Sequence, residues 1–210
     1  MATQAPARDA RIESPPARRT SPWPALLVGG VVLAGVALRF ITRSDLWLDE
    51  ALSVNIARLP LSDLHGALRH DGAPPLYYAL LHFWIRVFGT GDLATRSLSG
   101  VLSVATLPLA WFAGQRLGGR KLAVFALLVV ATSPYAIRYG TEARMYALIM
   151  LLVLAGYLAV LRALERPSVT RLAVVAVLTG LLVYTQYWCF YLVAVAGALL
   201  LWQSARSTAR

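Results

Sequence analysis

The stretch Met145–Leu161, MYALIMLLVLAGYLAVL, decides the fold, because it contains no charged side chain over its whole length. The hydrocarbon core of a bilayer is about 30 Å thick and is crossed by roughly 20 apolar residues in a helix. Comparable blocks cover Ala25–Ile41, Leu93–Phe112 and Leu122–Ile137. A water-soluble chain of 210 residues could not hide blocks of this length. The sequence therefore predicts an all-α integral membrane protein.

The composition agrees with that fold class. Hydrophobic residues make up 58% of the chain and charged residues 14%, whereas a soluble domain is roughly half apolar and a quarter charged. The net charge is +10, but the arginines cluster between apolar blocks, as topology signals do. We therefore expect no nucleic-acid partner. The single cysteine, Cys189, excludes an internal disulfide.

The last apolar stretch, Leu172–Trp202, is too long for one ordinary span and short for two. Gln186 lies at its middle, flanked by Tyr184, Tyr187 and Trp188. We expect two short helices with an aromatic turn between them. The total is then about six transmembrane helices.

The segment Pro74–Phe88, PPLYYALLHFWIRVF, is the ambiguous one, because as a helix it is only about 22 Å long. If it lies flat on the outer surface, three basic clusters fall on the same side as the basic N-terminus; if it spans, they alternate between sides. The positive-inside rule favours the flat arrangement. The clusters are Arg116/Arg120/Lys121, Arg162/Arg166/Arg171 and Arg206/Arg210.

These considerations predict a multi-pass protein of the cell (plasma or inner) membrane. Residues 1–24, rich in Pro, Ala, Arg and Ser, form a disordered basic cytoplasmic tail. Residues 25–203 form the transmembrane module, with an outer loop at 43–92 containing juxtamembrane helices, and 204–210 are a second cytoplasmic tail. Most acidic residues then lie on the outer face: Asp45, Asp49, Glu50, Asp63, Asp71, Asp92 and Glu142.

The first candidate site is LWLDEALS, where Asp49 and Glu50 follow the first helix. Desolvating carboxylates at a membrane surface is costly, so an adjacent pair there calls for a reason. A carboxylate in this place could take the proton of an acceptor hydroxyl, the role of a general base. The alternative is structural: Asp49 or Ser44 caps an interfacial helix.

The second candidate site is RHDGAPPLYY, which begins at Arg69. Gly72 and the two prolines end one helix and begin the next. His70 and Asp71 could position a substrate or bind a divalent metal, although a lone histidine beside one carboxylate more often does neither. No cofactor is firmly predicted.

Two further candidate sites follow. Arg138, Glu142 and Arg144 share a short outer turn with tyrosines that include Tyr146; an arginine fork at the lipid boundary suits a phosphate, and the alternative is an Arg–Glu ion pair in an aromatic belt. In the aromatic turn at 184–188 the flat rings could stack on sugars, or form a plain interfacial belt.

Taken in this order, the segments resemble the GT-C superfamily of membrane glycosyltransferases. The resemblance is to the family 39-like group related to protein O-mannosyltransferases and aminoarabinose transferases, and it covers residues 41–202. The segments that carry it are Asp49–Glu50, Pro74–Tyr78, Leu93–Gly118, Arg138–Tyr146 and Gln186–Trp188.

The resemblance implies inverting transfer of a sugar from a polyprenyl phosphate to a glycan, protein or lipid acceptor outside the cytoplasm. Asp49 would be the general base, Glu50 would orient the site, and Arg144 or Arg138 would hold the lipid phosphate. The substrate pocket would comprise His70, Asp71, Pro75, Tyr77, Tyr78, Glu142, Tyr146, Tyr187 and Trp188.

The sequence departs from the family pattern in two respects. Ala73 stands where the family often has a histidine before the prolines, with His70 three positions earlier. The chain also ends after about six helices, where relatives continue, so it resembles the N-terminal part of such an enzyme. The alternative is a truncated, non-catalytic membrane partner or a transporter-like subunit. A transporter keeps ionisable residues near the bilayer midplane, whereas this chain keeps them at helix ends.

Overall fold

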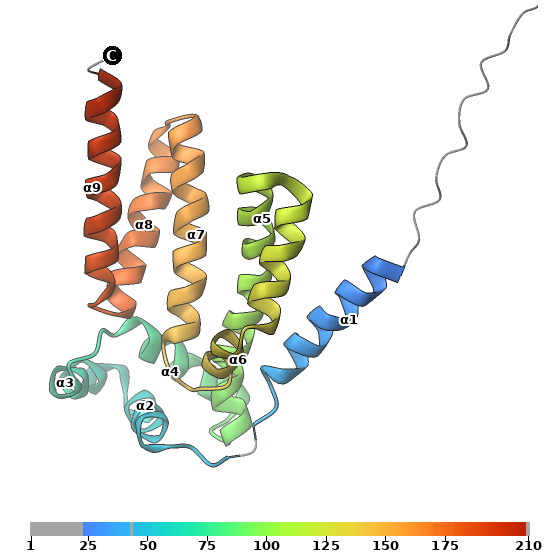
Figure 1. Ribbon diagram of the computed structural model, residues 1–210. Helices are drawn as coiled ribbons and strands as arrows, with labels where there is room; N and C mark the ends of the chain where they lie inside the picture. Colours follow the sequence, from blue (N-terminus) through green and yellow to red (C-terminus); the bar gives the residue numbers. More distant parts are fainter. Residues whose placement is uncertain (1–22, 43, 209–210) are drawn as a thin grey trace, which may run out of the picture.

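The computed structural model describes residues 23–42 and 44–208, and within them every regular element is an α-helix (Figure 1). The predicted all-α fold class is confirmed. The predicted N-terminal tail lies, except for its last two residues, outside the described residues, as do residues 209–210 of the C-terminal tail. The helices are α1 (Trp23–Leu38), α2 (Leu48–Arg58), α3 (Leu61–Asp71), α4 (Leu76–Phe88), α5 (Asp92–Thr132), α6 (Pro134–Gly140), α7 (Tyr146–Glu165), α8 (Val169–Thr185) and α9 (Cys189–Thr208).

Helix α5 is a hairpin of two antiparallel limbs rather than one rod (Figure 1). The reversal occurs at Gly118 and Gly119, and Gly119 has a φ of 72°, a left-handed conformation that glycine adopts without strain. The limbs approach closely at Gly114, where an added Cβ would lie 2.6 Å from the carbonyl oxygen of Leu122. The two expected spans at 93–112 and 122–137 therefore correspond to the two limbs.

The second limb ends earlier than the sequence pattern predicted. Its last helical residue is Thr132, and a separate short helix, α6, begins at Pro134. A proline disfavours helical backbone in the residue before it, and Ser133 accordingly has a ψ of 121°. The Ser133 hydroxyl accepts a hydrogen bond from the amide of Ala136 at 3.3 Å, so Ser133 caps the new helix. The prediction of one continuous helix over 122–137 was therefore wrong, because the helix ends at Thr132.

The final apolar stretch forms two helices, as predicted. Helix α8 ends at Thr185 and α9 begins at Cys189, and Gln186 between them has an extended backbone. The aromatic side chains of Tyr187 and Trp188 lie in this turn and are exposed. The turn closes the pair at the same end of the bundle as α2, α3 and α4 (Figure 1).

Three of the described helices are long and apolar enough to cross a membrane: Asp92–Thr132, Tyr146–Glu165 and Cys189–Arg206. The first of these contains the two limbs of α5. Helices α1 and α8 are apolar but shorter. Counting both limbs of α5 and adding α1 and α8 gives six membrane helices, and that number stays a prediction.

Helices α2, α3 and α4 lie at the lower end of the bundle in Figure 1, with α4 beneath α7 and α3 beneath α9. Tyr77 and Leu81 of α4 are completely buried there, in a core with Val54 of α2 and Leu148 of α7. The hairpin turn of α5 and the α7–α8 connection, which carry two of the basic clusters, lie at the opposite end (Figure 1). The flat, juxtamembrane orientation expected for α4 stays a prediction.

Helix α1 is joined to the bundle by a buried arginine. Arg39, one residue beyond the helix, donates from Nε to Ser103 Oγ at 2.8 Å and from its Nη atoms to the carbonyls of Ala131 at 2.9 Å and Val130 at 2.7 Å. These carbonyls belong to the last turn of α5, the negative end of the helix dipole. The charge is thus stabilised by helix-end carbonyls.

Close packing of α1 against α5 generates a prediction. A Cβ at Gly35 would lie 2.3 Å from the carbonyl oxygen of Ala131, whereas one at Gly30 would meet nothing within 4 Å. Gly35→Ala should therefore lower the free energy of unfolding by about 1–3 kcal/mol through overpacking. Gly30→Ala, which gains helix propensity without a clash, should raise it by about 0.5–1 kcal/mol. Equilibrium unfolding of both variants in detergent measures the difference, and equal stabilities would contradict the close contact.

Candidate active site

The centre of the candidate site is a fully buried carboxylate, that of Glu50 in the first turn of α2. Its Oε1 accepts hydrogen bonds from Arg96 Nε at 2.9 Å and from the amide of Ala143 at 2.8 Å. Its Oε2 accepts from Arg96 Nη2 at 2.6 Å and from the amide of Trp47 at 3.3 Å. Both oxygens are therefore occupied by donors.

Arg96, in the first limb of α5, completes this arrangement from the other side. Besides its two bonds to Glu50, it donates from Nη1 to the carbonyl of Ser44 at 2.6 Å and from Nη2 to that of Asp45 at 3.0 Å. One ion pair thus ties together α2, α5, the segment before α2 and, through Ala143, the connection between α6 and α7.

The environment of Glu50 sets its charge state. Burial acts to raise the pKa of the Glu50 carboxyl, but the hydrogen bonds from Arg96 and from the amides of Ala143 and Trp47, together with the charge of Arg96, outweigh burial and leave the pKa below its ordinary value. Hydrogen bonds to the ionised form favour that form. Glu50 is therefore ionised at neutral pH, and its carboxylate oxygens are already bonded to donors from Arg96, Ala143 and Trp47 rather than free for a substrate.

Asp49, the adjacent residue, has a different environment. Its side chain is 43% exposed, and its Oδ2 lies 3.8 Å from Nη2 of Arg144. Helix α2 has Trp47 as its N-cap residue, so the alternative in which Asp49 or Ser44 caps this helix is wrong. Within the described residues the Asp49 carboxylate has no other polar partner, which leaves it open to a ligand.

Arg144 lies beside Asp49, and of its side-chain nitrogens only Nη1 forms hydrogen bonds with described residues. Its Nη1 donates to Ser53 Oγ at 3.2 Å and, at 3.4 Å, to the backbone carbonyl of Asp49. Its Nε is buried and has no hydrogen-bond partner among the described residues. Buried donors are normally paired, so an orphaned guanidinium nitrogen beside a half-exposed carboxylate indicates a place for an anionic ligand.

The backbone of Arg144 is anchored from α4 and α5. Ser99 Oγ donates to the carbonyl of Arg144 at 3.2 Å and lies 2.9 Å from the hydroxyl of Tyr77. Tyr77 is completely buried, so its contribution is to hold this loop. Tyr78 is also buried and packs with Ile56 and residues of α3. Both tyrosines, expected to shape the substrate pocket, are buried in the two core clusters around α4.

The second predicted arginine, Arg138, is paired but accessible. Its Nε donates to Glu142 Oε1 at 2.9 Å, with the arginine side chain 72% exposed and that of Glu142 10% exposed. The ring of Tyr139 lies 4.5 Å from that of Tyr146, centroid to centroid. The ion-pair alternative is thus present in the structure, and it leaves most of the Arg138 side chain at the surface.

An apolar groove of about 520 Å³ adjoins this arginine-bearing turn. Its walls come from the second limb of α5, from α6 and from α7, and include Val129, Ile149 and Val153. Tyr139 and Tyr146 also line it. The groove therefore extends from the neighbourhood of Arg138 and Arg144 along α7 into the apolar part of the bundle.

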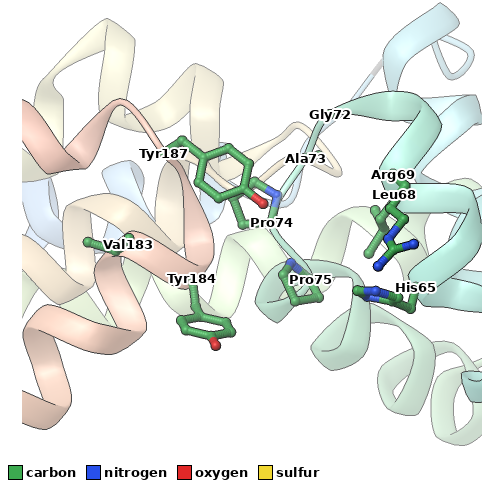
Figure 2. Close-up of a pocket in the computed structure, with 10 residues that line it drawn as sticks. All are labelled: His65, Leu68, Arg69, Gly72, Ala73, Pro74, Pro75, Val183, Tyr184 and Tyr187. Carbon is green, nitrogen blue, oxygen red and sulfur yellow. The ribbon is translucent and has the colours of Figure 1, made fainter.

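Two other predicted pocket residues lie elsewhere. Pro75 and Tyr187 line a separate cavity of about 760 Å³ between α3 and the end of α8 (Figure 2). Trp188 does not line it; its ring stacks on Tyr191 at 5.8 Å. The side chains of His70 and Asp71, which complete the predicted set, lie outside the described residues. The predicted site is therefore divided between two places.

The described residues form no cluster of side chains that would bind a metal ion. No group of three or more His, Cys, Asp or Glu residues comes together in the described part of the chain. That search does not include the side chains of His70 and Asp71, the residues proposed from the sequence for a divalent ion.

Sequence reasoning did not single out Arg96, Ser53 or Ser99 as site residues. A signal for Arg96 was present, because an arginine within a helix of small and apolar residues is rare unless it is paired or functional. Its partner could not be read from the sequence, since Glu50 lies 46 residues away. The serines give no signal, because they resemble ordinary small residues of a membrane helix.

The structure is a helical bundle with apolar helices long enough to cross a membrane and an acid–arginine cluster at one end. These features are those of a membrane protein with a polar site at the ends of its helices. Residues 72–210, more than half of the chain, match the family model of dolichyl-phosphate-mannose-protein mannosyltransferases. The chain belongs to this family, which places it among membrane glycosyltransferases of the GT-C type. No curated protein and no solved structure matches it.

The matched region includes Arg96, Arg138 and Arg144, whereas Asp49 and Glu50 precede it. The contacts of Glu50 with Arg96 and Ala143 bring the acidic pair onto the matched region. The tertiary structure thus joins the two parts of the sequence resemblance into one cluster.

The contrast between the two acids generates a stability prediction. Glu50→Gln removes one partner of a buried ion pair and leaves the Arg96 charge uncompensated, which should lower the free energy of unfolding by about 3–5 kcal/mol. Asp49→Asn removes a half-exposed carboxylate and should change it by about 0.5 kcal/mol or less. Denaturation in detergent checks both; equal losses would show that the acids share one structural role.

The lowered pKa of Glu50 generates a pH prediction. A carboxyl whose pKa is lower in the folded state than in the unfolded state, where it is about 4.3, stabilises the fold above the unfolded value and loses this contribution as the pH falls through the folded value. The difference in free energy of unfolding between wild type and Glu50→Gln should therefore be largest near pH 7 and shrink towards pH 4 and below. A difference independent of pH would contradict the assigned charge state.

Proposed function

We propose that this protein transfers a sugar from a polyprenyl phosphate to the hydroxyl group of an acceptor on the non-cytoplasmic side of the membrane, with inversion at the anomeric carbon. The observation that carries the proposal is the Asp49–Arg144 pair. A half-exposed carboxylate and an incompletely bonded guanidinium lie 3.8 Å apart, next to a saturated pair that holds them in place. Membership of the mannosyltransferase family supports glycosyl transfer as the reaction.

In the proposed reaction Asp49 acts as the general base. The acceptor oxygen attacks the anomeric carbon as its proton passes to the Asp49 carboxylate, and the bond from that carbon to the phosphate oxygen breaks. The products are the glycosylated acceptor and the polyprenyl phosphate, which leaves with one more negative charge. Attack opposite to the leaving group inverts the anomeric centre.

Arg144 would stabilise the leaving phosphate. Negative charge grows on the phosphate as the glycosidic bond breaks, so a fixed guanidinium lowers the energy of the transition state more than that of the bound substrate. The Nη2 of Arg144 approaches only the Asp49 carboxylate, at 3.8 Å, and its Nη1 makes a long bond to the Asp49 carbonyl, so the terminal nitrogens would supply the donors for a phosphate contact. Arg138, largely exposed on α6, would contact the same lipid phosphate from the surface.

The apolar groove beside this turn fits the isoprenoid chain of the donor. A polyprenyl-phosphate sugar joins a phosphodiester head with one negative charge to a long branched hydrocarbon. The groove has aliphatic walls on α5 and α7 and lies next to the turn that carries Arg138 and Arg144. Tyr139 and Tyr146 at this turn offer the amphipathic surface found where a lipid meets water. The head would then lie between Arg144 and Arg138.

The sidedness follows from charge. The acid–arginine cluster lies at one end of the bundle, and the α5 hairpin turn and the α7–α8 connection, rich in arginine, lie at the other (Figure 1). Arg116 and Glu165 form an ion pair between these two basic regions. The positive-inside rule assigns that end to the cytoplasm, so the transfer site would face the opposite side.

The test is sugar transfer by the full chain in liposomes from a panel of polyprenyl-phosphate sugars. Asp49→Asn should lower kcat by about 10²–10⁴-fold, the usual contribution of a general base, while its unfolding stays as in wild type. Asp63→Asn is the matched control, because Asp63 is an exposed acid on the neighbouring helix α3. Its turnover should match wild type.

Equal turnover by wild type and Asp49→Asn would exclude the assigned role of Asp49. No turnover by either, with the chain correctly inserted, would favour a non-catalytic membrane partner over a self-sufficient transferase. The donor that gives turnover would identify the sugar.

A further inference from the structure

The cavity of about 760 Å³ between α3 and the α8–α9 turn is not used by the proposed transfer (Figure 2). It shares no lining residue with the Asp49–Arg144 cluster or with the apolar groove. It is larger than the groove, and its lining is more polar. A cavity of this size accommodates a ligand of small-molecule dimensions.

One wall of the cavity is cationic. His65 and Arg69 are four residues apart on α3 and therefore lie on one face of the helix. In Figure 2 the Arg69 guanidinium and the His65 ring extend from α3 into the space beside Pro75. Both side chains are exposed, and neither forms a hydrogen bond or ion pair with another described residue. Their donors are thus available to a ligand.

The orientation of this wall is imposed by the packing of α3. Leu64 and Leu68 are buried against Ile56 of α2 and Tyr78 of α4. Because these apolar side chains hold one face of α3 against α2 and α4, Arg69 lies on the side of α3 that borders the cavity (Figure 2).

The facing wall is aromatic. Tyr184, in the last turn of α8, and Tyr187, in the turn that follows, project towards the cavity (Figure 2). Both rings are exposed and present flat faces and hydroxyl groups. Pro74 and Pro75, which have no free side-chain torsion, form a rigid floor between the two walls.

We propose that this cavity binds a phosphorylated saccharide. The guanidinium of Arg69 suits a phosphate through paired hydrogen bonds, and His65 supplies a further donor. The tyrosine rings suit the apolar face of a sugar, and their hydroxyls suit its hydroxyl groups. If the proposed transfer is correct, on which this role rests, the ligand is a part of the acceptor remote from its reacting hydroxyl.

The test is binding of glucose 6-phosphate to the full chain in phosphatidylcholine nanodiscs, measured by calorimetry without any donor. Arg69→Gln should raise the Kd by about tenfold or more, the effect of losing a charge-assisted hydrogen bond. Arg58→Gln is the matched control, because Arg58 is an exposed arginine at the end of α2 that does not line the cavity. Its Kd should match wild type.

The aromatic wall is tested separately with inorganic phosphate and glucose. Tyr187→Ala should weaken binding of glucose 6-phosphate and leave that of inorganic phosphate unchanged, and glucose should bind wild type at least about tenfold more weakly than its phosphate. Equal Kd values for Arg69→Gln and Arg58→Gln would overturn the proposal. So would loss of binding in Arg144→Gln with retention in Arg69→Gln, because the anion would then occupy the transfer site.

Two sources of the ligand are distinguished by the lipid composition. If the natural ligand is a glycolipid headgroup, nanodiscs containing phosphatidylinositol phosphate should compete with glucose 6-phosphate and raise its apparent Kd in wild type and Arg58→Gln. If it is a free phosphorylated glycan, the Kd should not change with the lipid. Either result supports the site, and neither depends on turnover, so failure of the transfer reaction would not be mistaken for failure of this pocket.

Discussion

The buried ion pair between Glu50 and Arg96 is the interaction on which the site depends. It joins two segments that are 46 residues apart in the chain, and through Ala143 it joins both to the loop between α6 and α7. Two charges taken out of water are stable only when hydrogen bonds satisfy them. Here four donors surround the carboxylate, and the geometry of the loop that carries Arg144 follows from that requirement.

The adjacent acids have different functions because of helix geometry. Consecutive residues of an α-helix point about 100° apart, so when Glu50 faces the core, Asp49 lies at the surface beside Arg144. Glu50 becomes saturated and fully buried, while Asp49 keeps an exposed carboxylate beside Arg144. Arg39 is another buried charge whose donors are satisfied, in this case by carbonyls at the end of α5. The fully hydrogen-bonded pair Glu50–Arg96 stabilises the fold. The Asp49–Arg144 pair, which is incompletely hydrogen-bonded, is the candidate for chemistry.

Much of the helical framework was predictable, because apolar blocks and turn residues act locally. The aromatic turn at 186–188, the end of α3 at Gly72 and the two limbs of α5 all follow from such signals. The expected helix over 122–137 is interrupted at Ser133–Pro134, because a proline disfavours helical backbone in the residue before it. The alternative in which Asp49 or Ser44 caps α2 was also wrong, since the N-cap residue is Trp47 and its amide donates to Glu50 Oε2.

The sequence by itself determined the membrane class, most of the helices and the types of residue available at their ends, because hydrophobicity and helix propensity are properties of short segments. Only the tertiary structure decided which acid is buried, that Arg96 is its partner, and that Tyr187 and Pro75 belong to a second cavity. The physical reason is that pairing of charges and burial depend on which helices pack together. Those contacts join residues that are far apart in the chain, and no local pattern encodes them.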